Sequence, residues 1–185
     1  MKLETCISEI RDWMQRNHLK LNDTKTEFLV IGSKTQLSQL SNDSIQIGDS
    51  IIKSSHSARN IGAIFDCTLS MKEHVATMCR ACYCIIRNIG KVRSSLTEDA
   101  AMTIVHAFIS SKLDHMYSLL FGITKHLLQK LQNNSARIIV KARHRNHISP
   151  VLKRLHWLPV DKRIELKILL TTFKAMTDQH PGYIN

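Results

Sequence analysis

The 185-residue chain has few of the residues that mark disordered, cross-linked or membrane-spanning proteins. Glycine occurs six times and proline three times, which argues against disorder and low-complexity repeats. Five cysteines, an odd number, give no disulfide framework and are typical of a reducing compartment. No apolar run approaches the ~20 residues of a membrane span, and the first residues lack the apolar stretch of a secretory signal. We therefore expect an intracellular protein of the nucleus or cytoplasm that is neither secreted nor bound to a membrane.

Acidic residues are scarce in one part of the chain only. Residues 1–66 hold eight Lys/Arg and eight Asp/Glu, whereas residues 67–185 hold 18 and seven and so carry the entire net charge of +11. Residues 115–160 contain eight Lys/Arg, five His and no acid at all. A surface selected only for solubility interleaves both signs. The missing acids indicate a polyanionic partner, most simply nucleic acid; an acidic membrane surface, an acidic protein or a merely solvated basic surface are the alternatives.

The spacing of apolar residues changes at the same place and predicts two domains, residues 1–66 and 67–185. In the first, helical spacing is followed by short β-branched runs, with Gly48 and Asp49 as a tight turn. In the second the pattern is helical throughout, with Thr97 as an N-cap and Pro150 at the first position of its helix. The fold class is thus predicted as α+β, a small antiparallel sheet with one helix followed by a helical bundle. The expected helices are 3–16, 71–93, 98–121, 125–143, 150–156 and 160–178, and the expected strands are 26–31, 44–47, 50–54 and 60–65.

Basic side chains repeat at helical spacing on three of these predicted helices, opposite apolar positions. The three stripes are Arg80, Arg87 and Lys91; Lys130, Arg137 and Lys141; and Arg163, Lys167 and Lys174. Side by side they would line a groove whose natural counter-charge is the phosphates of a duplex, although any one stripe is equally typical of a solvated face. The few aromatic residues do not suffice to stack successive unpaired bases, so contact with a duplex backbone is favoured.

Motifs for catalysis and metal binding are missing. Cys79, Cys82 and Cys84 are close in sequence, but a helix directs them to different sides, so they do not converge on one ion. The chain has no P-loop, no GxSxG, no GxGxxG and no Asp-Asp pair for two-metal phosphoryl transfer. We expect no metal site, no cofactor, no small-molecule substrate and no catalytic residue in this chain by itself.

Several segments, in the correct order, resemble one protein family. NHLKLNDTKTEFLVIG (residues 17–32) is similar to the end of the palm in reverse transcriptases of non-LTR, LINE-type retrotransposons, whose motif has an N-x-L-x-L-N-x-x-K-T-E core. ARNIGAIFD (58–66) resembles the following primer-grip hairpin, and LSMKEHV, LDHMYSLLFG, HISPVLKRLHWLPVDKRIELK and HPGYI resemble the thumb and the region after it. The resemblance covers essentially the full chain. It implies a palm end in residues 1–66 and a thumb-like domain in 67–185 that contacts an RNA/DNA template–primer duplex.

The same resemblance implies a fragment of an RNA-directed DNA polymerase. The carboxylates that hold two metal ions in this family, including the Asp-Asp of its YxDD motif, precede the matching region, so this chain alone is expected to be inactive and Mg²⁺ to serve only a complete polymerase. Lys25 matches a lysine proposed to protonate the leaving pyrophosphate; a solvent-facing lysine is the alternative. Gly62 matches the primer grip, where it would let the backbone approach the primer. Ile61 and Phe65 match it too, with core packing as the alternative.

One departure and two rival interpretations remain. The family commonly has about three more residues between positions 131 and 137, a loss that would rotate the downstream basic face by roughly 60°. A helical protein-interaction module, with the front sheet as its docking edge, is one rival. The other is a decayed retroelement relic with no selected function.

Overall fold

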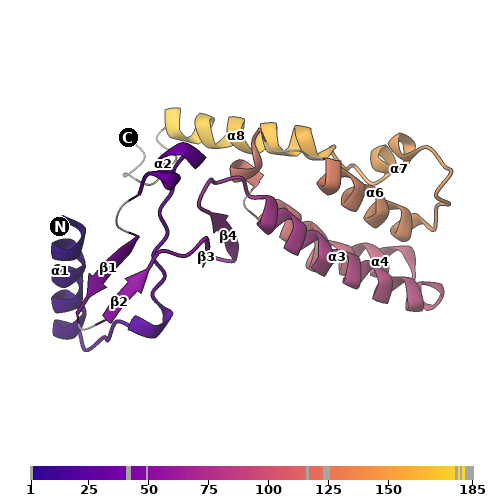
Figure 1. Ribbon diagram of the computed structural model, residues 1–185. Helices are drawn as coiled ribbons and strands as arrows, with labels where there is room; N and C mark the ends of the chain where they lie inside the picture. Colours follow the sequence, from indigo (N-terminus) through magenta and orange to yellow (C-terminus); the bar gives the residue numbers. More distant parts are fainter. Residues whose placement is uncertain are drawn as a thin grey trace. The chain divides into compact units, whose positions relative to one another are not determined.

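The computed structural model describes residues 2–40, 43–48, 50–115, 117–122, 126–177, 179 and 181. The fold is α+β, as the sequence predicts: two small antiparallel hairpins occur in the first part of the chain and helices dominate the rest (Figure 1). The chain divides into two compact units, Met1–Glu73 and His74–Asn185, a few residues beyond the change in charge.

The N-terminal unit combines one long helix with two separate two-stranded hairpins. Helix α1 lies beside strand β1, with the half-buried Ile7 and Met14 on one side of the helix (Figure 1). Strand β1 pairs with β2 and strand β3 pairs with β4, both antiparallel. The elements are α1 (Lys2–Arg16), η1 (Asp23–Lys25), α2 (Lys34–Ser38), β1 (Ser44–Ile47), β2 (Ser50–Lys53), β3 (Ser57–Asn60) and β4 (Ala63–Asp66).

Two strand predictions in this unit are wrong. The run 26–31 forms only a single bridge, between Phe28 and Ser54, because β-branched residues make a strand only where a partner strand lies alongside. The run 60–65 is the turn and second strand of a hairpin. Ile61 and Gly62 form its two-residue turn with φ of 47° and 82°, as a type I′ turn requires. Of the Gly48-Asp49 turn, Gly48 has φ of 59° and Asp49 lies outside the described residues.

Asp66 fixes the segment that leads from β4 into the first long helix. The carboxylate is 5% exposed and accepts hydrogen bonds from the backbone N–H and the hydroxyl of both Thr68 and Ser70, and from the N–H of Met71 at 2.7 Å. These donors stabilise a tight path in which Leu69 and Met71 have positive φ. Burial opposes ionisation of Asp66, but the hydrogen bonds from Thr68, Ser70 and Met71 outweigh it and hold its pKa well below the ordinary value.

The C-terminal unit is helical. Its buried apolar side chains come from every long helix, among them Cys82, Val105, Leu131 and Ile164. The elements are α3 (Lys72–Val92), η2 (Arg93–Ser95), α4 (Glu98–Val105), η3 (His106–Ser110), α5 (Ser111–Asp114), η4 (Tyr117–Leu120), α6 (His126–Val140), α7 (Ile148–Arg154) and α8 (Val160–Met176).

The predicted helix 98–121 is interrupted. Thr97 caps its start as expected, accepting from the Ala100 N–H at 3.2 Å. The π-helical segment η3 then follows α4, and α5 ends at Asp114. The buried apolar residues along this stretch recur every fourth position, a longer period than the 3.6 of an α-helix, and a wider π turn keeps them on one side. These buried residues are Ala101, Val105, Ile109 and Leu113.

The start of α7 also differs from the prediction. The helix begins at Ile148 with His147 as its N-cap, which places Pro150 at the third helical position. Proline is tolerated there because the first N–H groups of a helix have no intrahelical acceptor.

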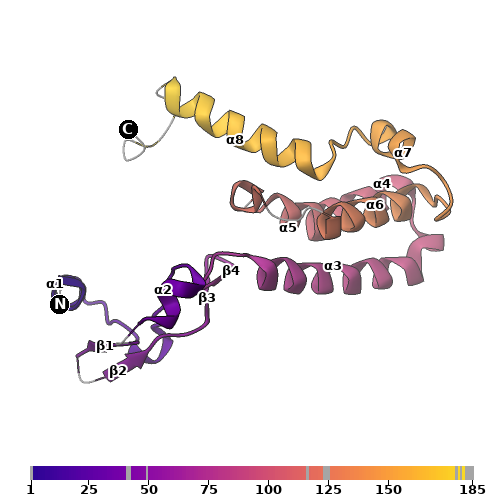
Figure 2. The same ribbon diagram turned by 45° about the horizontal axis from the view of Figure 1, so that its top comes forward.

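Two glutamines of α6 attach the start of α8. Gln132 is 1% exposed and donates to the Leu158 carbonyl at 2.8 Å, while the Gln129 side chain accepts from the Val160 N–H at 2.9 Å. Trp157, expected to be a core or corner residue, is buried just before this turn, with its ring edge-on to His106. The first turn of α8 is thereby fixed on the bundle, and the helix then extends away from α4 and α6 (Figures 1 and 2).

We predict that Asp66→Asn lowers the free energy of unfolding by about 1–3 kcal/mol, because the amide accepts fewer of these hydrogen bonds. The folded-state pKa of Asp66 is lowered, so its stabilisation is complete above the ordinary pKa of 3.8 and is lost as the pH falls below that value. Urea unfolding at pH 7 and at pH 3 measures both effects. The difference between wild type and variant should shrink at the lower pH. Asp12→Asn, on the exposed surface of α1, is the control; an equal loss in both variants would contradict the assignment.

Candidate nucleic-acid interface

Helix α3 separates its apolar and basic residues cleanly. Val75, Met78, Cys82 and Ile89 are buried. The basic residues of the predicted stripe, Arg80, Arg87 and Lys91, are all exposed on the opposite side. The helix therefore presents three cations to solvent along a single face.

The second predicted stripe is only partly open to solvent. Lys130 is exposed, and so is Lys141, which ends α6 in the left-handed conformation with φ of 53°. Arg137 is half-buried and its Nη2 donates to the Asn146 carbonyl at 3.3 Å. Arg137 thus holds the loop after α6, which leaves Lys130 and Lys141 as the more accessible cations of this helix.

A side-chain contact joins the basic faces of α3 and α6. The Asn134 amide donates to the Tyr83 hydroxyl at 3.3 Å. Tyr83 follows Arg80 by three residues and precedes Arg87 by four, so it lies on the same face of α3. Asn134 occupies the corresponding position between Lys130 and Arg137 on α6. The two stripes therefore border one contact line instead of facing different sides of the bundle.

The two helices also run in the same direction. Beyond the Tyr83 contact, Gly90 approaches Ile138, and Arg93 donates to the last carbonyls of α6, so the contacts follow the same order along both helices. Along this shared direction the cations at the start of the two stripes, Arg80 and Lys130, correspond to each other, as do those at the end, Lys91 and Lys141. Like charges arranged in this way repel one another unless an anion binds between them.

Arg93 fixes the far end of this pair of helices. Its side chain is 8% exposed, and its Nε donates to the Ile138 carbonyl at 2.6 Å. Its Nη2 donates to the Ile139 carbonyl and its Nη1 to the Leu96 carbonyl at 2.7 Å. The Ala142 N–H bonds the Arg137 carbonyl, the next orphan acceptor of α6. The last carbonyls of a helix lack intrahelical donors, so Arg93 caps α6 from the corner that follows α3.

The third predicted stripe is partly engaged within the protein. Arg163 donates to Asp114 at 2.9 Å and its guanidinium lies 5.9 Å from the centre of the Trp157 ring, so it acts within the fold. Lys167 and Lys174 are exposed. They border large apolar side chains of α8, whereas the α3 cations have polar neighbours.

The exposed cations of α3 and α6 have no acidic partner among the described residues. The salt bridges recorded in the described part of the C-terminal unit join Glu98 to Arg154, Glu165 to Lys162 and Asp114 to Arg163. Among the described residues, no carboxylate pairs with the exposed cations Arg80, Arg87, Lys91, Lys130 or Lys141.

Sequence reasoning did not single out two features of this surface. The exposed cations Arg143 and Arg145 lie in the loop after α6, next to Lys141. The absence of Asp and Glu from residues 115–160 is the sequence feature that could have identified Arg143 and Arg145. Arg93 was missed as well, because its partners are backbone carbonyls of residues far along the chain and leave no side-chain pattern.

Lys25 and Gly62 lie in the N-terminal unit. Lys25 is exposed at the end of η1, where its N–H bonds the Asn22 carbonyl at 3.1 Å. Gly62 is exposed at the tip of the β3–β4 hairpin. Ile61 beside it is 76% exposed, so the core-packing alternative is wrong for Ile61, while Phe65 is half-buried.

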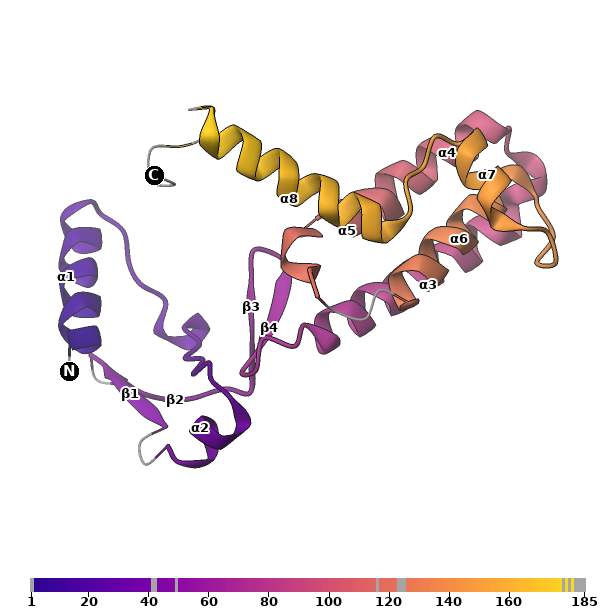
Figure 3. The same cartoon turned by 90° about the horizontal axis from the view of Figure 1, so that it is seen from above.

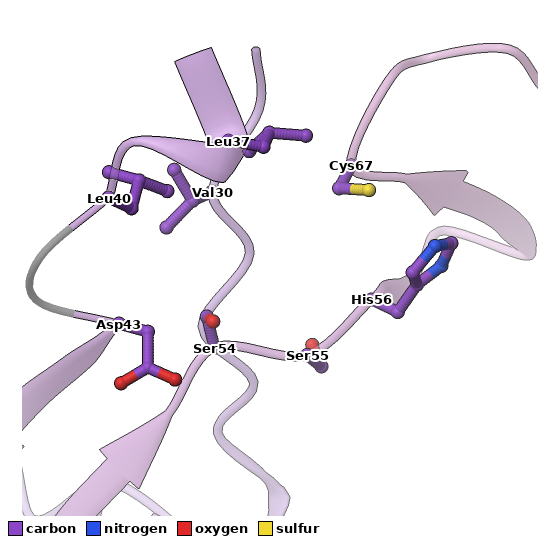
Figure 4. Close-up of a pocket in the computed structure, with 8 residues that line it drawn as sticks. All are labelled: Val30, Leu37, Leu40, Asp43, Ser54, Ser55, His56 and Cys67. Carbon is purple, nitrogen blue, oxygen red and sulfur yellow. The ribbon is translucent and has the colours of Figure 1, made fainter. Parts of the chain in front are cut away.

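The described residues contain no group of three or more His, Cys, Asp or Glu side chains arranged to hold a metal ion. Cys79 and Cys82 are buried, and burial raises the pKa of both thiols, whereas Cys84 is exposed. A pocket of about 480 Å³ in the N-terminal unit does contain His56, Cys67 and Asp43. Figure 4 shows Asp43 at the opposite end of this pocket from the other two, so the three do not form a catalytic or metal-binding group.

Within the part of the chain that the structure describes, no helix has both the length and the apolar character needed to cross a bilayer.

Comparison with known proteins gave no match: no family model, no curated protein and no solved structure is significantly similar to this chain.

We predict that Arg93→Met lowers the free energy of unfolding by about 2–4 kcal/mol, since it leaves buried carbonyls of Ile138 and Ile139 without donors. Arg87→Met, an exposed change on the preceding helix, should stay within about 0.5 kcal/mol of wild type. Chemical denaturation followed by circular dichroism measures both. Similar losses in the two variants would show that Arg93 is not the cap.

Proposed function

We propose that this chain is the palm end and thumb of a LINE-type reverse transcriptase. It contacts a template–primer duplex through backbone phosphates and has no catalytic carboxylates of its own. The observation that carries the proposal is the Tyr83–Asn134 contact, because it joins α3 and α6 at positions that border the exposed cations of both helices. We infer the family from the order of the sequence motifs, and we infer the mode of binding from the exposed cations of α3 and α6.

The chemistry of this surface suits phosphate better than base recognition. Lysine and arginine side chains on two roughly parallel helices neutralise a regular row of phosphates without reading sequence. The loop cations Arg143 and Arg145 extend the row past the end of α6. Lys25 and Gly62 would meet the nucleotide and the primer only in a complete polymerase, which would also supply the carboxylates for Mg²⁺.

Salt dependence tests the proposal directly. The affinity for an RNA–DNA duplex, measured by fluorescence anisotropy, should fall steeply with salt, with a slope of about −0.9 in log–log form for each phosphate contacted. The double variant Arg87→Gln/Lys130→Gln should reduce that slope by about 1.8.

The matched control removes two cations elsewhere. Lys34→Gln/Lys53→Gln changes exposed lysines of the N-terminal unit and should leave the slope unaltered. A salt-independent affinity, or an equal effect of both double variants, would refute phosphate contact by α3 and α6.

A primer-extension assay with Mg²⁺ and all four nucleotides should give no product above background, because the chain has no Asp-Asp pair to hold two metal ions. Extension that persists in a Lys25→Ala background would point to a contaminating polymerase. Extension that is abolished by that change would contradict the predicted inactivity of the chain.

A further inference from the structure

Helix α8 is apolar on two opposite faces. One face contains Val160 and Ile164, which are buried against the bundle. The other carries five large apolar side chains, here called the α8 stripe, that are 44% to 81% exposed. A helix that is apolar on both sides normally lies between two layers, yet the bundle supplies only one. The α8 stripe consists of Leu166, Leu169, Leu170, Phe173 and Met176.

The stripe forms one continuous surface. Its residues follow one another at intervals of three and four, so they are neighbours on the helix surface. This half of α8 extends beyond α4 and α6, which leaves it clear of those helices (Figures 2 and 3). Contiguous exposed apolar surface of this kind marks an interaction site, in contrast to single scattered apolar residues.

A hollow of about 440 Å³ opens beside the first half of the stripe. Leu166, Leu170, Tyr117 and Lys167 line it, together with Arg163 and Asp114, which pair with each other at 2.9 Å. Tyr117 is 3% exposed, and burial raises its pKa to about 12 while the neighbouring Arg163 opposes that rise. Lys167, which is exposed beside the same hollow, suits an acceptor that carries negative charge.

The charges along the α8 stripe also favour a negatively charged partner. Lys167 and Lys174 lie along one edge, and no described carboxylate pairs with either. At the N-terminal end of the stripe, Lys162 and Glu165 pair with each other at 2.9 Å and contribute little net charge. The stripe is therefore apolar in the middle and positive on one side. A nucleic-acid backbone would match the lysines but would leave the apolar side chains exposed.

A second copy of α8 fits this surface poorly. In an antiparallel pair related by a two-fold axis, like edges meet, so the lysine edge of one helix would face the lysine edge of the other. The self-pairing would bring four unpaired lysines together, which opposes association.

We propose that the α8 stripe and the adjoining hollow bind an amphipathic helix from a protein partner, whose apolar face has an acidic border that pairs with Lys167 and Lys174. The apolar side chains supply the contact area and the acidic border fixes the orientation. This role is separate from the duplex surface of α3 and α6.

The probe is a fluorescein-labelled peptide of about 18 residues with leucine on one face and glutamate along its border. A second peptide has lysine in place of every glutamate. Fluorescence anisotropy with the full chain should give saturable binding of the acidic peptide and roughly tenfold weaker binding of the basic one. No saturable binding of the acidic peptide, or equal affinity for both, would overturn the proposal.

Variants of the chain locate the binding. Leu169→Gln/Phe173→Gln keeps good helix formers and should weaken acidic-peptide binding roughly tenfold or more, with duplex affinity unchanged. Thr171→Gln/Thr172→Gln, on exposed positions of the same helix outside the stripe, should leave both affinities unchanged. Lys167→Gln should weaken binding of the acidic peptide alone. Equal effects of the two double variants would refute the assigned face.

Two further measurements exclude other occupants of the stripe. The Leu169→Gln/Phe173→Gln variant should keep the melting temperature of wild type; a clear fall would show that the stripe is already covered within the chain and would overturn the proposal. Sedimentation equilibrium should give a monomer for wild type without peptide. Concentration-dependent dimerisation that the stripe variant abolishes would assign the surface to a second copy and equally overturn it.

Discussion

The packing of α3 against α6 depends on the guanidinium of Arg93. One planar group with several donors meets the carbonyls of Ile138, Ile139 and Leu96, which helix geometry leaves without partners. Its positive charge also lies at the negative end of the α6 dipole. The same residue therefore caps α6, lies in the turn after α3 and joins the ends of the two helices.

The basic charge of this protein has at least two structural roles. Arg93, Arg163 and Arg137 act within the fold, on carbonyls, on Asp114 and on the loop after α6. The exposed cations of α3 and α6 have no acidic partner among the described residues, so they remain available to an external anion. Net charge does not distinguish these two roles. The burial and the hydrogen-bond partners of each basic side chain distinguish them.

The α+β class, the end of α1 and the cap at Thr97 follow from the sequence, because helical periodicity and capping are local. The π-helical break at η3 and the outcome at 26–31, a single bridge instead of a strand, do not follow from the sequence. Both depend on which residues, far away in the sequence, pack against these segments. The α3 stripe is exposed as the periodicity indicates. On α8 the same reasoning noted only the basic residues Arg163, Lys167 and Lys174, whereas Phe173 and its apolar neighbours, which an isolated helix pattern assigns to a core, are exposed.

The π-helical segment η3 makes the length of this part of the chain as important as its composition. Its wide turn accommodates one residue more than an α-helical path between the same points needs. A deletion of a single residue there would let the segment wind as uninterrupted α-helix with Leu113 still on the interior side, because the spacings of the buried apolar residues would become four, three and four. An insertion of one further residue, by contrast, would turn the following residues by about 100° and would reposition Asp114, the partner of Arg163.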